Sequence, residues 1–168
     1  MTLSMYTASV PVFRQLLNSL SEVLAKAESH AAERKIEPAA LLQARLYPDM
    51  FALTRQVQIA ADFAKGACAR LAGVEVPKWA DTEQSFEELR ARLAKTVAFI
   101  DDLPQDQIEQ SAERVINTSA GPKSKTFAGH TYLVHYALPQ FLFHATTAYA
   151  ILRHNGVEIG KRDFMGTF

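Results

Sequence analysis

The chain has 168 residues, of which 48% are hydrophobic and 21% charged, and this composition is typical of one globular domain, here expected over residues 1–168. Its 18 basic residues balance its 18 acidic residues, with no block rich in lysine or arginine. A protein that binds phosphate backbones normally carries a basic face, so nucleic acid is not expected as a partner. The single cysteine, Cys68, excludes an internal disulfide and is typical of a reducing compartment. Because the first residues do not form a secretory signal, we expect a cytoplasmic location.

Two helices are predicted in the first half of the chain, because apolar residues recur there at three- and four-residue steps. The first helix is expected to have Ser9 as its N-cap and Pro11 in its first turn. A short helical piece is expected to follow Pro38. The second helix is expected to run from Asp49, whose carboxylate would cap the first free amides, to Gly73, a residue that commonly ends helices.

A third helix is predicted within residues 81–103 by the same periodicity. Ser85 and Glu88 have the spacing of a capping box. Asp81 or Thr82 would instead start the helix one turn earlier. Both alternatives leave the same apolar stripe facing the other helices.

A fourth helix is expected from Gly129-His130 to Asn155-Gly156, where the glycine suits a C-terminal cap. Alternation in 115–118 and 126–127, broken at Gly121-Pro122, predicts a small β-hairpin in the connection before this helix. The protein is therefore predicted to be all-α, a four-helix bundle with a longer crossover before the last helix.

Residues 126–152 carry no Asp, Glu, Lys or Arg, and the stretch is long enough for a membrane span. It nevertheless holds three histidines, Gln140 and Pro139, and each such group is costly in hydrocarbon. A central bundle helix, contacted on nearly all sides, explains the same pattern. We therefore expect no membrane association.

The polar residues of this helix predict a ligand pocket inside the bundle. Gln140 and His144 lie one turn apart and share a face, and Pro139 leaves the carbonyl of His135 without its helical donor. Gln56 lies close to the apolar side of the second helix. We expect these side chains to line one polar pocket, with a purely structural, hydrogen-bonded His144 as the alternative.

Two long stretches and the N-terminal segment resemble a known family. These are LLQARLYPDMFALTRQVQIAADFAKG, LPQFLFHATTAYAILRHNGVEIGKRDF and SMYTASVPVF. Together they resemble an uncharacterised bacterial domain family of the DinB/YfiT-like superfamily, with nearly the whole chain covered. The resemblance implies a four-helix bundle that is commonly homodimeric. We further expect the apolar tail, residues 156–168, to pack across its own bundle or a partner's.

The resemblance also implies a metal site in some relatives, made by one histidine on the second helix and an H-x-x-x-H pair on the fourth. These positions fall on Gln56, Gln140 and His144, so only His144 matches. Neutral amides are weak substitutes for the ligands that zinc requires, so no cofactor is expected. Zinc or nickel remains the alternative, with Asp49, His135 or water filling the gaps.

Three functions follow from these observations. The first is binding of a small molecule in the pocket of Gln56, Gln140 and His144. The second, which the resemblance implies, is a metal-dependent transferase or hydrolase acting on a small thiol or amide substrate. The third is a structural or dimerisation protein without a ligand. The residues do not by themselves name a reaction.

Overall fold

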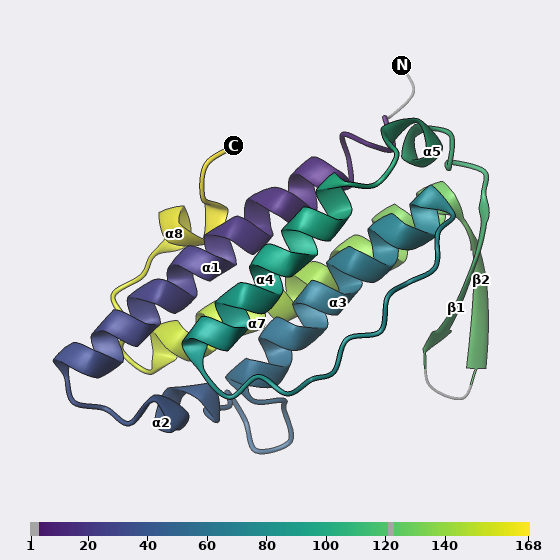
Figure 1. Cartoon of the computed structure of the whole chain (residues 1–168). Coiled ribbons are helices and arrows are strands. Elements are labelled where there is room, and N and C mark those ends of the chain that lie inside the picture. The colour runs from purple at the N-terminus through teal and green to yellow at the C-terminus, as the bar shows by residue number, and fades with distance from the viewer. Residues whose placement is uncertain (1–3, 121–122) are drawn as a thin grey trace.

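Four long helices lie along one common axis in the computed structural model, which describes residues 4–120 and 123–168 (Figure 1). The long helices are α1 (Val10–Glu33), α3 (Leu53–Ala72), α4 (Phe86–Asp101) and α7 (Leu138–His154). Helix α3 packs against α7 and α4, and α1 packs against α4. The shorter elements are α2 (Pro38–Leu42), α5 (Gln105–Glu109), β1 (Val115–Ala120), β2 (Lys123–Ala128), α6 (Gly129–Thr131), η1 (Tyr132–Ala137) and α8 (Lys161–Met165). The predicted bundle with a hairpin before its last long helix is confirmed.

The core forms where the apolar stripes of the four long helices meet. Phe13 of α1 and Phe141 of α7 are fully buried and pack edge to face with ring centroids 5.0 Å apart. Leu53 of α3 and Leu89 of α4 are also fully buried. Each such side chain contributes roughly 1.5–3 kcal/mol through burial, so the stripes hold α3 and α7 at a fixed distance.

The predicted helix starts are confirmed for α4 and, in position, for α1, where Ser9 is the N-cap residue and Pro11 lies in the first turn. The predicted start is wrong for α3. Ser85 accepts a hydrogen bond from the Glu88 amide at 3.1 Å and caps α4. The Ser9 hydroxyl instead donates to the carbonyl of Met5 at 2.6 Å and caps no amide of α1. Asp49 lies in a turn, and α3 begins four residues later.

The late start of α3 has a tertiary cause. The Leu53 amide donates to the carbonyl of Ala44 at 3.0 Å, which holds the segment between α2 and α3 in a closed loop. The chain is therefore still turning at Asp49, where a local reading of the sequence places a cap. At its other end α3 stops as expected at Gly73, which adopts the left-handed conformation with φ 73°.

The β-hairpin is antiparallel and pairs Val115 with Ala128 and Ile116 with Phe127. It stands beside the ends of α3 and α7 in Figure 1. The predicted break at Gly121-Pro122 lies outside the described residues. The strands lead directly into α6, so the hairpin sets the position at which the last helical segment begins.

A π-helical segment, η1, separates α6 from α7, although one regular helix was expected here. Its wider turn shifts the hydrogen bonds by one residue, so that the amide of Leu138 donates to the carbonyl of Leu133. Pro139, which has no amide hydrogen, then falls in the first turn of α7. The Leu138 amide keeps its hydrogen bond through the π-helical pattern, so the proline removes only its own amide from the helical hydrogen bonds.

The C-terminal tail packs on its own bundle, which is one of the two positions expected for it. Helix α8 lies beside α1 (Figure 1). The Ser19 hydroxyl donates to the carbonyl of Asp163 at 2.7 Å, and Lys26 pairs with the Asp163 carboxylate at 2.6 Å. Phe164 packs edge to face on Tyr149, with ring centroids 5.7 Å apart.

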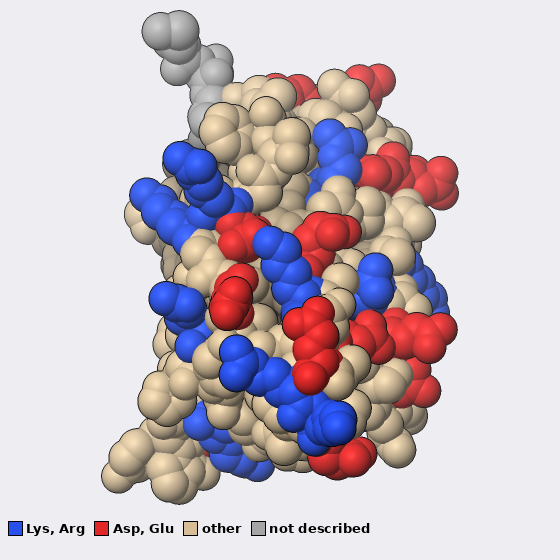
Figure 2. Space-filling view, turned by 90° about the vertical axis from the view of Figure 1, so that its left-hand side faces the viewer, with Lys and Arg blue, Asp and Glu red and all other residues tan. Residues whose placement is uncertain are grey.

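Charged side chains of both signs alternate over the face drawn in Figure 2, without a large patch of one sign. Among the helices of the described residues, none is long and apolar enough to cross a membrane.

Candidate functional site

Gln56 of α3 and His144 of α7 meet between the two helices. They lie 88 positions apart in the sequence, and the Gln56 Oε1 atom is 2.7 Å from His144 Nδ1. Gln56 is 1% exposed and His144 is 8% exposed. The packing of α3 on α7 therefore brings together two of the predicted site residues.

The hydrogen bonds of Gln56 determine which proton His144 carries. The Gln56 Nε2 group donates to the backbone carbonyl of Phe51 at 3.1 Å, and only the amide nitrogen can donate to a carbonyl. The amide oxygen consequently faces His144, so Nδ1 of the ring must be the donor. Nε2 of His144 then holds a lone pair, and it has no hydrogen-bond partner among the residues that the structure describes.

His144 is held in its neutral form. Burial lowers the pKa of the ring below its usual range, and the nearby Arg55 guanidinium lowers it further. A neutral ring with its Nδ1 proton already committed can only accept a hydrogen bond, or bind a metal, through Nε2.

Two aromatic rings enclose the imidazole. Phe63 of α3 is stacked on His144 with centroids 6.0 Å apart and an angle of 13° between the planes. Phe143 meets it edge to face at 5.2 Å. The ring is thus fixed by packing as well as by its hydrogen bond, which is the support that an oriented recognition group requires.

The other two predicted pocket residues occupy different environments. Gln140 is half-buried and lies one turn before His144 on the same helix. His135 is exposed, in the π-helical segment. Their contact with a ligand stays a prediction.

The residues do not fit the metal site that the resemblance implies. Both polar atoms of Gln56 are engaged, with His144 and with the Phe51 carbonyl, so its oxygen is not free to bind a metal. Among the described residues, no group of three or more His, Cys, Asp or Glu side chains is placed to hold a metal ion. The described side chains around His144 therefore do not form a set of metal ligands.

Cys68 has no role in this site. It is fully buried, and burial raises the pKa of its thiol well above the usual range. A thiol held in its protonated form is a poor nucleophile.

The sequence reading missed a buried ion cluster between α3, α4 and the loop that joins them. Arg92 of α4 has a side chain that is only 2% exposed, and it lies 3.0 Å from Asp62, 2.8 Å from Asp81 and 3.0 Å from Glu83. It also donates to the carbonyl of Ala80 at 3.1 Å.

One sequence signal could have revealed this cluster. Arg92 lies between Leu89, Leu93 and Thr96, all of them on the buried face of α4, so an arginine interrupts the apolar stripe at a core position. An arginine there must be paired. Its three acidic partners come from α3 and from the loop, and the sequence alone does not place that loop.

The comparisons with known proteins agree with this geometry. The family described as Domain of unknown function (DUF1993) matches residues 5–165. The chain belongs to the DUF1993 family. It is also similar to the crystal structure of a DinB family member protein from Shewanella denitrificans, with 38% sequence identity and a TM-score of 0.90 over 97% of this chain and 92% of that one. The family therefore belongs with the DinB-like bundles, as the sequence resemblance implied. A comparison with curated proteins finds no match.

Proposed function

We propose that this DUF1993 protein binds a small molecule beside the Gln56–His144 pair, with His144 Nε2 accepting a hydrogen bond from the ligand. The observation that carries the proposal is the chain of hydrogen bonds from the Phe51 carbonyl through Gln56 to His144. This chain fixes a neutral imidazole with one acceptor atom left over. Nε2 is not among the buried side-chain atoms of the described residues that lack a partner, so it can be reached from outside the bundle by a ligand.

The ligand suited to this site has a hydrogen-bond donor next to an apolar surface. The donor, a hydroxyl, amide or thiol group, would bind Nε2. The Phe63 and Phe143 rings would contact the apolar part. Pockets with a few oriented polar groups among aromatic side chains are typical of small-molecule sites. We propose that Gln140, half-buried one turn before His144, adds a second polar contact.

The metal-dependent transferase or hydrolase is the second candidate. One observation favours it, since metal-bound histidines usually donate their second ring nitrogen to an oxygen, as His144 does to Gln56. The engagement of both Gln56 atoms counts against it. In a third reading, a bundle without any ligand, water would donate a hydrogen bond to the Nε2 lone pair. We propose the cytoplasm as the location, in keeping with the single, buried cysteine.

Native mass spectrometry of protein purified without chelator tests the proposal. We expect a retained small molecule in the natural protein, lost in Gln56→Leu, which leaves the orientation of His144 undefined. Arg153→Ala, at an exposed position near the far end of the same helix, should retain it. Loss of the bound mass from the control as well, or the absence of any bound mass, would favour the bundle without a ligand.

Elemental analysis of the same preparation separates the second candidate from the first. We expect clearly less than one zinc or nickel ion per chain, because amides replace two of the three imidazole ligands. Gln56→His combined with Gln140→His should raise the metal content. About one tightly held ion per chain in the natural protein, lost in His144→Ala, would favour the metal enzyme.

A further inference from the structure

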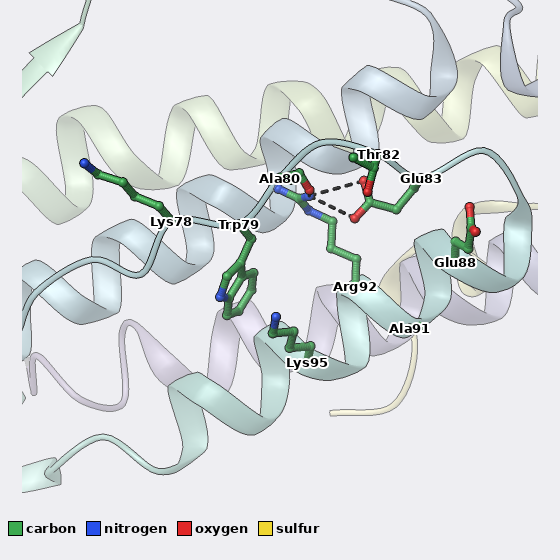
Figure 3. Close-up of a pocket in the computed structure, with 9 residues that line it drawn as sticks. All are labelled: Lys78, Trp79, Ala80, Thr82, Glu83, Glu88, Ala91, Arg92 and Lys95. Carbon is green, nitrogen blue, oxygen red and sulfur yellow. Dashed lines mark hydrogen bonds and ion pairs between the residues drawn. The ribbon is translucent and has the colours of Figure 1, made fainter.

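A cavity of about 520 Å³ lies between α4 and the loop that precedes it, lined by residues other than those of the His144 site. Figure 3 shows its walls, with Trp79 on the loop and Lys95 on α4 near one end. Thr82 and Glu88 lie near the other end. Ala91, a small residue of α4, also lines the hollow. The cavity is therefore basic and aromatic at one end and acidic at the other.

The ion cluster beneath this cavity is balanced within itself. Arg92 and Lys65 both bind Asp62, Arg92 also binds Asp81 and Glu83, and Arg55 binds Asp81. Three cations thus meet three carboxylates. Burial alone would raise the pKa of Glu83, but the hydrogen bonds from Arg92, from a backbone amide and from Gln58, together with the charge of Arg92, outweigh it and the pKa lies below its usual range. These groups hold the loop in place and leave no net charge for a ligand.

Three charged residues outside the ion cluster line the cavity, Lys78, Glu88 and Lys95. The Lys78 side chain points away from Trp79 (Figure 3), so Glu88 and Lys95 are the two that remain for a ligand. Lys95 is exposed and lies 4.4 Å from the centre of the Trp79 ring, and no carboxylate is paired with it among the described residues. Glu88 is exposed and uses its Oε2 atom to accept from the Gln84 amide at 2.5 Å. Its Oε1 atom has no hydrogen-bond partner in the described part of the chain. The cavity thus offers a cation at one end and a carboxylate oxygen at the other.

The spacing of these two groups defines the length of the ligand. Glu88 and Lys95 are two turns apart on one face of α4, which corresponds to a rise of about 10.5 Å. A tripeptide in extended conformation spans about 10 Å. A single amino acid would reach only one of the two groups.

We propose that this cavity binds an elongated zwitterion of the short-peptide class. The ligand's carboxylate would pair with Lys95, and its ammonium group would pair with Glu88 beside the Thr82 hydroxyl. Its backbone would cross Ala91 beside Trp79, whose ring centre lies 4.4 Å from the ammonium groups of both Lys65 and Lys95. The ion cluster around Arg92 acts as a support that holds the Trp79 loop over α4.

Trp79 is the chain's single tryptophan, so its fluorescence reports on this cavity alone. Titration with triglycine should change the fluorescence in a saturable way, with a dissociation constant on the order of 0.1–1 mM, as expected for a small ligand in an open site. N-acetylated triglycine lacks the ammonium group, and triglycine amide lacks the carboxylate. Each should bind about tenfold more weakly, because each loses one charge-assisted contact.

Matched variants test the two assigned ends. Lys95→Met and Glu88→Gln should each weaken triglycine binding about tenfold, and Gln at position 88 still caps the helix. Glu87→Gln, exposed in the same first turn, and Lys161→Met, on α8, should bind as the natural protein does. No saturable signal up to 10 mM triglycine (roughly ten times the weakest expected constant) would overturn the proposal. Equal binding of all three peptides, or equal losses in the control variants, would also overturn it.

Discussion

At the scale of single residues, His144 makes the stability of the fold depend on pH. Burial and Arg55 lower the pKa of its ring in the folded state, whereas the unfolded chain takes up a proton near the usual value of about 6.5. As the pH falls through that value, the unfolded state binds the proton first and is stabilised relative to the folded state. The contribution of His144 to stability is therefore complete at higher pH and is lost in acid.

The first prediction compares urea unfolding at pH 7.5 and pH 5.5. The free energy of unfolding of the natural protein should be lower at pH 5.5. In His144→Asn, which cannot titrate, the difference between the two pH values should be smaller. Equal pH dependence in both proteins would show that the buried ring is not the group responsible.

A second residue-scale prediction concerns Gly129, where strand β2 passes into α6. A Cβ atom built there would lie 1.9 Å from the carbonyl oxygen of Ser111, which is backbone and cannot move aside. Gly129→Ala should therefore destabilise the protein by more than about 2 kcal/mol. Gly156→Ala is the matched control, because that glycine has φ 86° but nothing within 4 Å of the added atom. It should cost about 1 kcal/mol, the ordinary penalty of the left-handed conformation. Equal losses measured by urea denaturation would contradict the steric argument.

At the scale of elements, the cluster around Arg92 holds α3, α4 and their connecting loop together. Among the described residues, removing Arg92 leaves Glu83 without a cation, whereas Asp62 keeps Lys65 and Asp81 keeps Arg55. Breaking a buried ion pair from one side typically costs 3–5 kcal/mol. Arg92→Met should therefore lower the free energy of unfolding by about 3 kcal/mol. Arg90→Met, on the same helix, removes only a half-exposed pair with Glu28 at 3.8 Å and should cost less than about 1 kcal/mol. Chemical denaturation of the two variants checks the difference, and similar losses would mean that the cluster does not hold the loop.

The helices also show how much of the fold could be predicted from the sequence. The long helices were predictable because their apolar residues repeat with the helical period, and Ser85 caps α4 through a contact only three residues away. The start of α3 was not predictable, since it depends on a tertiary bond from Leu53 to Ala44. The π-helical turn before Pro139 was not predicted, because the presence of a proline does not determine which carbonyls the neighbouring amides bind.

The candidate site, like the helices, could be predicted only where it depends on the helical repeat. Gln56 and His144 could be paired because each lies on the inner face of a helix whose neighbours follow from the bundle. The Arg92 cluster and the Trp79 loop could not be located, because residues 74–85 have no periodicity that places them. Long loops are positioned by side-chain contacts that become visible only in three dimensions.

At the scale of the whole molecule, one apolar face stands out on the outer side of α7. Phe143 is 56% exposed, and Leu142, Phe51 and Leu46 are also exposed. A cavity of about 530 Å³ between α7 and the loop before α3 runs through this face, and no charged residue lines it. Exposed apolar patches of this kind commonly mark interfaces.

The proposed occupant of this face is a second copy of the chain. In a two-fold dimer the same patch meets itself, so charges of one sign would face each other. The uncharged lining of this cavity avoids that repulsion, and a two-fold axis through the patch would cover Phe143 of both copies at once. Such an interface would also cover the side of α7 on which Phe143 contacts His144.

The last prediction tests this assembly by light scattering at micromolar concentration. The natural protein should have the mass of a dimer, because the face would otherwise leave several large apolar side chains in water. Phe143→Lys should shift the mass toward that of a single chain, since it would place two buried ammonium groups near each other across the axis. Val115→Lys introduces the same charge at an exposed valine of β1, 66% exposed, and should remain dimeric. Unfolding curves of both variants would show that each is still folded. A natural protein with the mass of one chain, or an equal shift in the Val115 variant, would refute a dimer formed through the α7 face.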